Sequence, residues 1–523
     1  MENSLLTIIL FAPSIAAVLT LLIPKDYKKL IRVWALVTSL VPLVFALVAW
    51  FSFEGAAADP NGYKFVVNTP WYQAIGSSFH LGMDGLSLTM VLLTTLLTPL
   101  AILASYGIDD RVRMYMALFL FLETGMLGVF LSLDLLLFFV FWEIGLVPMY
   151  FLINQWGSPK GERELWGGMK VSNRTYASFK FMIYTMAGSL GLLLAIQMLG
   201  VVFQTFDLPY IVGQWNALAP TDEILGGFTT VGTAKSVAFW AFTIAFALKV
   251  PVWPFHTWLP DAHTEAPTAG SMILAGVLLK LGAFGFLRFV LPLYPEQAQA
   301  GANVLAGLAT AAIVFGAFAA FGQRDFKRLV AYSSVNHMGF VVLGIAAAAK
   351  AIGTPDATIA LNGAVLQMFN HGLSAAGMFF LVGVVYDRIH TRNLDEMGGY
   401  FPLVPVYGGV LIFTSMASLG LPGLNGFVSE FLVVRGAWPI FTFWTALSML
   451  GLLFTGAYIL KGIAKSLHGP INEAHTHHLT EINKRELAVI TPLMVLMLWL
   501  GVWPGWLLGV IDKAMLALQS VIG

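Results

Sequence analysis

Apolar stretches of about twenty residues follow one another along almost the whole chain, separated by short polar connections. A stretch of that length can cross the hydrocarbon core of a bilayer as an α-helix. The pattern therefore predicts an all-α polytopic membrane protein with about 14 transmembrane helices. The helices are expected at residues 5–24, 31–53, 86–106, 114–131, 135–152, 179–203, 237–259, 269–291, 304–321, 329–348, 359–386, 403–437, 444–463 and 487–511.

The composition agrees with a membrane environment. Hydrophobic residues make up 58% of the 523 positions and charged residues only 11%, whereas soluble domains carry about a quarter charged residues. The first apolar stretch follows Glu2 and has no small-residue cleavage site before Lys25, so we expect a retained helix and not a signal peptide. The sequence contains no cysteine, which excludes iron–sulfur clusters, thiolate zinc sites and disulfides within this chain.

Lysine and arginine residues gather in the connections that follow odd-numbered helices, for example in residues 25–32, 160–174 and 324–328. The long connections of the opposite set, 54–83 and 204–232, are poor in positive charge. Short cytoplasmic loops hold the excess of lysine and arginine in membrane proteins. We therefore expect the first set to face the cytoplasm and both termini to lie on the non-cytoplasmic side.

Two of the predicted helices contain helix breakers in their middles. The seventh is interrupted at Lys249-Val-Pro251, and the twelfth is interrupted in "LGLPGLNGFVSEF", where Pro422 and Gly423 lie. A pair of Pro- or Gly-interrupted helices in corresponding positions is typical of a transporter with inverted repeats and a site at the breaks. A simple packing kink at each break is the alternative.

The two breaks are five helices apart, an odd number, so two copies of a repeat would have opposite orientations. We expect helices 4–8, residues 114–292, to form the first repeat and helices 9–13, residues 302–466, to form the inverted second one. Residues 1–113 would then form an N-terminal three-helix segment, and residues 487–523 would form a C-terminal helix.

Six ionisable side chains lie near the middle of predicted helices, where such groups are costly and usually face a bundle interior or a hydrated cavity. They are Glu143, Lys249, Lys280, His337, His371 and Glu430. This mixture of acids and bases suits a proton relay, because lysine, unlike arginine, can release its proton. Two alternatives remain open: a lone histidine can be a hydrogen-bonding contact between helices, and Glu143 and Lys249 can form a purely structural ion pair.

Other motifs give no indication of bond chemistry. The histidine cluster in residues 473–478 lies in a polar loop, so we expect a solvated loop and not a metal site. Asp84 in "HLGMDGLSL" is expected to cap a helix at a membrane-edge turn, and Trp142 is expected to pack or to anchor an interface. No nucleophile–base pair, Walker motif or Rossmann fingerprint occurs.

The segment "PFHTWLPDAHTEAPTAGSMILAGVLLKLGAFGFLR", residues 254–288, closely resembles the signature of the antiporter-like membrane subunits of respiratory complex I. That family also includes subunits of multisubunit sodium/proton antiporters and of membrane hydrogenases. The resemblance covers essentially the whole chain. Within the family, "FVFWEIGLVPMYFLI", "NHMGF", "FNHGLSAAGMFFL" and "GLPGLNGFVSEFL" are most similar to the M type, whose mitochondrial counterpart is subunit four.

The resemblance implies roles for the six ionisable residues. By similarity, Glu143 of helix five pairs with Lys249 of broken helix seven, and Lys280 is the central proton carrier. The residues that would extend this hydrophilic axis to its exit side are His337, His371 and Glu430.

The same resemblance implies a proton-translocating subunit of NADH:quinone oxidoreductase, driven by quinone reduction in other subunits. The alternative is a subunit of a sodium/proton antiporter or of a membrane-bound hydrogenase. FMN, iron–sulfur clusters and quinone would belong to partner subunits, which agrees with the absence of cysteine. The expected surroundings are a bacterial inner membrane with L-, N- and K-type subunits as neighbours and a peripheral redox arm in indirect contact.

Overall fold

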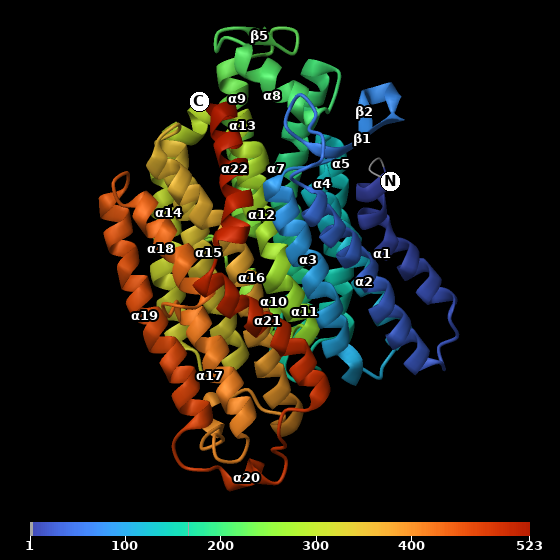
Figure 1. The fold of residues 1–523 in the computed structure, drawn as a ribbon, viewed down its shortest axis with the longest axis vertical. Helices are drawn as coiled ribbons and strands as arrows, with labels where there is room; N and C mark the ends of the chain where they lie inside the picture. The colour runs from blue at the N-terminus through green and yellow to red at the C-terminus, as the bar shows by residue number, and fades with distance from the viewer. Residues whose placement is uncertain (1–3, 166) are drawn as a thin grey trace.

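The computed structural model describes residues 4–165 and 167–523, and helices dominate it (Figure 1). Within these residues, 14 helical segments are long and apolar enough to cross a membrane, which confirms the predicted all-α polytopic class. In chain order the helices are α1 (Leu5–Leu22), α2 (Lys28–Ser52), α3 (Gly85–Ala104), α4 (Val112–Leu131), α5 (Leu135–Ile144), α6 (Leu146–Trp156), α7 (Asn173–Phe203), α8 (Leu208–Ala217), α9 (Val231–Lys249), α10 (Trp258–Glu265), α11 (Thr268–Ile273), α12 (Leu279–Gly285), α13 (Leu291–Leu293), α14 (Pro295–Gly322), α15 (Phe326–Lys350), α16 (Pro355–Ile389), α17 (Pro405–Leu419), α18 (Asn425–Ala437), α19 (Thr442–Leu467), α20 (Glu473–Thr476), α21 (Lys484–Val502) and α22 (Gly505–Ile522).

The remaining elements are short. Three antiparallel hairpins pair β1 (Lys64–Tyr72) with β2 (Ser77–Met83), β3 (Glu162–Glu164) with β4 (Lys170–Ser172), and β5 (Glu223–Ile224) with β6 (Thr229–Thr230). The 3-10 segments are η2 (Gln73–Ile75), η3 (Ser105–Gly107) and η6 (Leu394–Glu396), and the π-helical segments are η4 (Leu274–Leu278) and η5 (Phe286–Val290).

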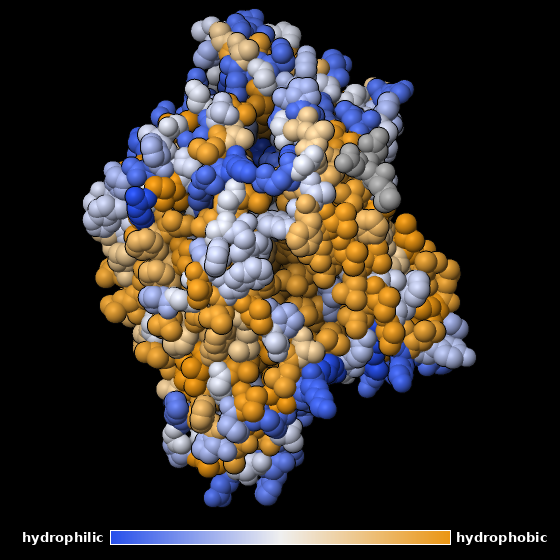
Figure 2. All heavy atoms as spheres, in the orientation of Figure 1, coloured by the Kyte–Doolittle hydropathy of each residue, from blue (hydrophilic) through white to orange (hydrophobic). Residues whose placement is uncertain are grey.

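The molecule has polar ends and an apolar middle. In Figure 1, β1, β2, α8 and β5 lie at one end of the bundle and α20 at the other, and α1 begins and α22 ends toward the hairpin end. Figure 2 shows hydrophobic side chains over the middle of this face and hydrophilic ones at both ends. This distribution is the one expected of a protein whose middle lies in lipid.

The expectation of a single last helix over residues 487–511 is wrong. The chain forms α21 and α22, which are separated at Trp503 and Pro504. Proline lacks a backbone N–H and disfavours helical dihedral angles in the residue before it, and Trp503 has left the helix with φ −137° and ψ 74°. In Figure 1 the two helices follow one another along the long axis.

The helix expected at residues 135–152 is divided at Gly145 into α5 and α6. Pro148 cannot donate the backbone hydrogen bond that the Ile144 carbonyl would accept in a regular helix. Helix α4 comes close at this point, because Gly125 has no side chain: a Cβ atom added to it would lie 2.8 Å from the Gly145 backbone. The junction directly after Glu143 is therefore a contact point between α4 and the α5–α6 span.

The two broken spans are interrupted where the sequence carries its helix breakers. Helix α9 ends at Lys249, and α10 begins at Trp258, whose indole N–H donates to the Leu248 carbonyl at 2.9 Å. Helix α17 ends in Gly420 with φ 83°, and Gly423 in the same turn has φ 93°. Both glycines need the left-handed region that other residues rarely adopt.

The span between α10 and α14 is, together with α16, the most enclosed in the described part of the bundle. Segments α11, η4, α12, η5 and α13 form one continuous helix over Thr268–Leu293, and every residue of its most apolar window is buried. Two π-helical turns interrupt it, one on either side of α12. Such turns are rare and often occur at functional sites.

The order of spans is the same in the two expected repeats. In residues 114–292 the fourth of five spans is the broken pair α9 and α10, and in residues 302–466 the fourth is the broken pair α17 and α18. The inverted relation between the two sets, and the boundaries of the N- and C-terminal segments, stay predictions.

Asp84 caps α3, as the sequence predicts, and also holds an arginine. Its Oδ1 accepts from the Ser87 backbone N–H at 2.9 Å and from Arg288 Nη2 at 2.6 Å, while Arg288 Nη1 donates to the Tyr63 hydroxyl at 2.9 Å. Burial by itself raises the pKa of Asp84, but the Arg288 guanidinium and the hydrogen bonds from Ser87 outweigh burial and hold that pKa below its usual value. The cluster ties the entry of α3 to η5.

We predict that Asp84→Asn destabilises this end of the molecule. The substitution leaves the buried Arg288 charge without compensation, so the free energy of unfolding falls by about 3 kcal/mol. Because the pKa of Asp84 in the folded protein lies below its ordinary value of 3.8, the carboxylate stabilises the fold above about pH 3.8 and ceases to do so as the pH falls further. Thermal unfolding of the purified protein in detergent, followed from neutral to acidic pH, measures both effects.

Asp110→Asn is the matched control, since among the described residues the Asp110 carboxylate pairs only with its exposed neighbour Arg111 and such surface pairs contribute about 0–1 kcal/mol. An equal loss of stability in both variants would contradict the role given to Asp84.

Candidate functional site

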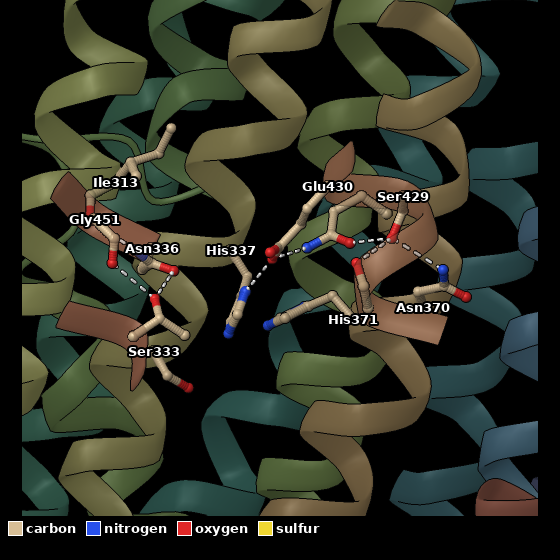
Figure 3. Close-up of polar contacts among 12 residues, drawn as sticks. Ile313, Ser333, Asn336, His337, Asn370, His371, Ser429, Glu430 and Gly451 are labelled. Carbon is tan, nitrogen blue, oxygen red and sulfur yellow. Dashed lines mark hydrogen bonds and ion pairs between the residues drawn. The ribbon is translucent and has the colours of Figure 1, made fainter. Parts of the chain in front are cut away.

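Helices α15, α16 and α18 bring three polar side chains together around Glu430 in the bundle interior (Figure 3). His337 Nδ1 lies 2.7 Å from Glu430 Oε1, and Gln367 Nε2 donates to the same oxygen at 3.0 Å. Ser429 Oγ in turn donates to Gln367 Oε1 at 2.5 Å. The other ring nitrogen of His337, Nε2, lies 3.2 Å from the Tyr458 hydroxyl. Every polar atom named here has a protein partner.

Lys280 and His371 form the centre of the site. Lys280 Nζ lies 2.7 Å from His371 Nδ1 and 2.5 Å from the carbonyl oxygen of Ala275, which belongs to the π-helical segment η4. The rings of His371 and His337 are 5.7 Å apart between centroids, and Figure 3 shows the His371 ring directed toward His337. Four of the six predicted residues thus form one series: Lys280, His371, His337 and Glu430.

The structure does not bring Glu143 and Lys249 into contact. Among the described residues, no ion pair within 4.0 Å joins them, and neither Glu143 Oε1 nor Lys249 Nζ has a hydrogen-bond partner. The pairing implied by the resemblance involves no direct bond in this structure and stays a prediction.

Trp142 does more than the packing expected from the sequence. The Lys249 ammonium lies 4.7 Å from the centroid of the Trp142 ring, and the indole N–H donates to Ser189 Oγ at 2.9 Å. A cation over a desolvated tryptophan face is attracted by about 2 kcal/mol. Trp142 is thus the direct neighbour of the lysine at the first break.

The residues at the breaks have different surroundings. Pro251 is buried between α9 and α10, whereas Pro422 and Gly423 are exposed between α17 and α18. A Cβ atom added to Gly420 would lie 3.3 Å from Glu430 Oε2, so the second break directly borders the acid of the axis.

His263 and Glu123 are among the buried ionisable residues that were not predicted from the sequence. His263 in α10 is fully buried, its two ring nitrogens have no hydrogen-bond partner in the described part of the chain, and the ring stacks on Phe379 at 4.4 Å. The charges of Lys327 and Lys280 both act on it. Glu123 in α4 is equally buried. The position of Glu123 inside an apolar run of the sequence could have identified it as a buried acid. His263 lies in α10, which is too short to be recognised from sequence as a membrane span, so its burial could not be predicted.

A cavity opens at the C-terminal end of α10. It has a volume of about 440 Å³, and its lining includes Glu265, Lys327, Asp387 and Arg392. Lys327 donates to the Ala266 carbonyl at the end of α10. Across residues 4–165 and 167–523, no group of three or more His, Cys, Asp or Glu side chains is arranged to hold a metal ion.

Comparisons with known proteins agree with this architecture. Residues 132–455 match the family described as "NADH:quinone oxidoreductase/Mrp antiporter, TM", and residues 62–133 match "NADH-ubiquinone oxidoreductase chain 4, amino terminus". Two NADH-quinone oxidoreductase subunits M are similar over nearly their whole length. That of Rhodobacter capsulatus is 38% identical, with 96% of this chain and 94% of the relative covered. That of Pseudomonas aeruginosa is 39% identical, with 98% and 97% covered.

Solved structures are similar as well. A chain of respiratory complex I from Thermus thermophilus superposes with a TM-score of 0.84 at 26% identity, with both chains covered completely. A chain of the Mrp complex from Dietzia shares the fold with a TM-score of 0.80 at 20% identity, over 100% of this chain and 99% of the other. The sequence relationship, more than the shared fold, decides the family. The chain belongs to the M-subunit family of NADH-quinone oxidoreductase, the antiporter-like membrane subunits of respiratory complex I.

Proposed function

We propose that this chain is the proton-translocating membrane subunit of an NADH:quinone oxidoreductase and moves protons along its buried axis while quinone reduction in other subunits supplies the energy. The observation that carries the proposal is the series of groups from Lys280 through His371 and His337 to Glu430, with two direct contacts of 2.7 Å. All four can bind and release a proton. Relatives of this chain are named subunit M of that enzyme.

The series assigns a step to each group. A proton on Lys280 Nζ passes to His371 Nδ1 along the contact of 2.7 Å. His371 Nε2 has no protein partner among the described residues, so one water, or a rotation of the ring, links it to His337. His337 then donates to Glu430, where Gln367 and the second break hold the carboxylate. Histidine suits the middle position because its two ring nitrogens can take up and release a proton on opposite sides.

The first half of the axis supplies Lys280 through water. Glu143, Lys249 and His263 have buried polar atoms without protein partners in the described part of the chain. Buried polar groups are satisfied by protein or by ordered water. We therefore assign water-mediated transfer to this half, with Lys249 as the group whose charge responds to Glu143.

The turn at the second break supports the proposal that partner subunits lie beside this chain in the membrane. Leu421 is 45% exposed in this turn and Phe431, close behind it, is 51% exposed, and Pro422 and Gly423 are exposed as well. Irregular backbone at membrane depth is tolerated only where protein or a hydrated cavity covers it. We assign the cover to a neighbouring membrane subunit, within the set of L-, N- and K-type neighbours.

The cofactors and the cellular location follow from the same proposal. We assign FMN, iron–sulfur clusters and quinone to partner subunits; for the clusters, the supporting observation is that this chain has no cysteine to ligate them. We assign the membrane as a bacterial inner membrane with both termini on the non-cytoplasmic side. The lysine- and arginine-rich connections follow odd-numbered helices, so they lie on the other side of the membrane from the termini, and such connections face the cytoplasm.

A sodium/proton antiporter subunit is the second candidate, because the matched family includes Mrp antiporters and the Mrp complex of Dietzia shares the fold. Purification of the chain with its natural partners separates the two. An oxidoreductase brings flavin and iron–sulfur absorbance with it, whereas an antiporter brings neither.

We predict that Lys280→Ala reduces proton pumping by at least about tenfold while the complex still assembles, because the central proton carrier is lost. Lys280→Arg should also impair pumping, since arginine cannot cycle its proton. Pumping by the reconstituted complex in proteoliposomes is the measurement. Lys350→Ala, at the exposed end of α15, is the matched control and should pump normally. Full coupled pumping by Lys280→Ala would remove Lys280 from the path.

A second prediction is that Glu143 and Lys249 act as one unit. The variants Glu143→Gln and Lys249→Met should each reduce pumping strongly, and the double variant should be no worse than either single one, because each loss disables the same step. Glu143→Asp keeps the charge and should have a mild effect. Pumping rates for the complete double-mutant cycle provide the test; if the two losses simply add, the residues act independently.

The third prediction concerns water at the breaks. In an experimental structure of the whole assembly with ordered solvent, we expect water within about 3 Å of Lys249 Nζ and of Glu143 Oε1, and hydrated space beside Pro251 and Pro422. A dry interior with a direct contact between Glu143 and Lys249 would contradict the water-mediated first half.

A further inference from the structure

Glu123 is a buried acid that the proposed proton path does not use. It lies in the middle of α4, its side chain is fully inaccessible, and neither carboxylate oxygen has a hydrogen-bond partner among the described residues. Buried polar groups are nearly always hydrogen-bonded, and an ionisable group at membrane depth usually has a function. Packing alone does not account for Glu123.

Few ionisable groups reach the depth of Glu123 from the elements packed against α4, which are α1, α2, α3, α5, α6, α12 and β2. Helices α1 and α3 carry none, and Tyr150 of α6 packs on the ring of Phe179. The groups near the ends of these elements and of α4 itself are Lys28, Lys29, Arg32, His80, Arg113 and Tyr115. Glu143 on α5 and Lys280 on α12 are the charged residues left for the interior.

Helix α3 connects Glu123 to the surroundings of Lys280. Thr98 borders Glu123, but its hydroxyl donates to the Thr94 carbonyl at 2.9 Å. Leu97, which precedes Thr98, lies close to Gly276: a Cβ atom added to Gly276 would be 2.5 Å from Leu97 Cδ1. The residue before Gly276 is Ala275, whose carbonyl accepts a hydrogen bond from the Lys280 ammonium. Glu123 and that ammonium therefore flank the same turn of α3.

A second contact sets the register of α4 against α12. The rings of Phe130 and Phe284 meet edge to face with centroids 5.1 Å apart. Phe130 lies two turns beyond Glu123 on the same face of α4, and Phe284 lies one turn beyond Lys280. The face of α4 that carries Glu123 is thus the face directed toward the helix of Lys280.

Lys280 lacks a carboxylate partner of its own. Its contacts are the His371 ring and a backbone carbonyl, and no ion pair within 4.0 Å includes it among the described residues. An ammonium group in a low-dielectric interior needs a compensating negative charge. Of the two acids on the elements packed against α4 and on α4 itself, Glu143 directly follows Trp142, whose ring lies 4.7 Å from the Lys249 ammonium.

We infer that Glu123 is the counter-charge of Lys280: its carboxyl group is neutral while Lys280 is an amine, and it ionises when Lys280 holds a proton. The inference rests on the proposed function of Lys280. One proton moves between the Glu123 carboxyl oxygen and Lys280 Nζ through intervening water, so the two residues together stay neutral. When Lys280 passes its proton to His371, the Glu123 carboxylate regains one from the Glu143 side. Glu123 is thus both the counter-charge of Lys280 and the group that returns a proton to it.

The test uses the intact complex with Glu123→Gln, which keeps size and removes the charge, and Glu123→Asp, which keeps the charge. Proton pumping in proteoliposomes is measured as a function of pH. Without the carboxylate, the protonated form of Lys280 needs a more acidic medium, so the alkaline limb of the profile should move to lower pH by about one unit in Glu123→Gln. Glu123→Asp should keep the wild-type midpoint.

Thr124→Val is the matched control, because Thr124 adjoins Glu123 and accepts a hydrogen bond from Ser14 at 2.7 Å without carrying charge. It disturbs α4 packing and should leave the midpoint unchanged. A wild-type midpoint in Glu123→Gln, or an equal shift in the control, overturns the inference. Normal pumping by Lys280→Ala would instead overturn the proposed function itself.

If Glu123→Gln fails to assemble, infrared difference spectra of the wild type and Glu123→Asp replace it. Turnover should change the carbonyl stretch of a protonated carboxyl group, and that band should shift in the Asp variant. Identical difference spectra in the two proteins would show that Glu123 does not change its protonation state and would overturn the inference.

Discussion

A titratable side chain in the membrane interior needs a partner, and regular helices have none to offer because their backbone groups bond to one another. In this chain the helices depart from regular geometry beside the titratable groups. Lys249 is the last residue of α9, Lys280 lies between two π-helical turns, and the turn at Gly420 borders Glu430. The carbonyl that accepts from Lys280 belongs to one of those turns. The site thus depends on local loss of helical regularity.

The two halves of the axis meet this requirement in different ways. From Lys280 to Glu430 the groups contact one another or are linked by facing imidazole rings. Around Lys249 and His263 the polar atoms have no protein partner in the described residues, and only the Trp142 ring faces the ammonium of Lys249. In the proposed proton path, transfer in the second half therefore depends on side-chain geometry, whereas transfer in the first half depends on water entering the interior.

Much of the fold could be predicted because lipid imposes simple rules on sequence. Hydropathy located the spans, and proline and glycine located the breaks at Pro251 and Pro422. The π-helical turns beside Lys280 could not be predicted, since neither η4 nor η5 contains a proline and the same residues also suit an α-helix. Pro504 does indicate a helix break in the last span, but apolar residues continue on both sides of it, so hydropathy alone predicted one uninterrupted helix.

Contacts between side chains were less predictable than spans, because they depend on how closely distant helices approach. Gly276 and Gly372 pack backbone against backbone: a Cβ atom added to Gly372 would lie 3.0 Å from the Gly276 carbonyl oxygen. Small residues allow such an approach in membranes. The approach places His371, the neighbour of Gly372, within 2.7 Å of Lys280. The sequence contains both glycines and both titratable residues. Only the packing of the two helices shows that the contact between the glycines determines the distance between Lys280 and His371.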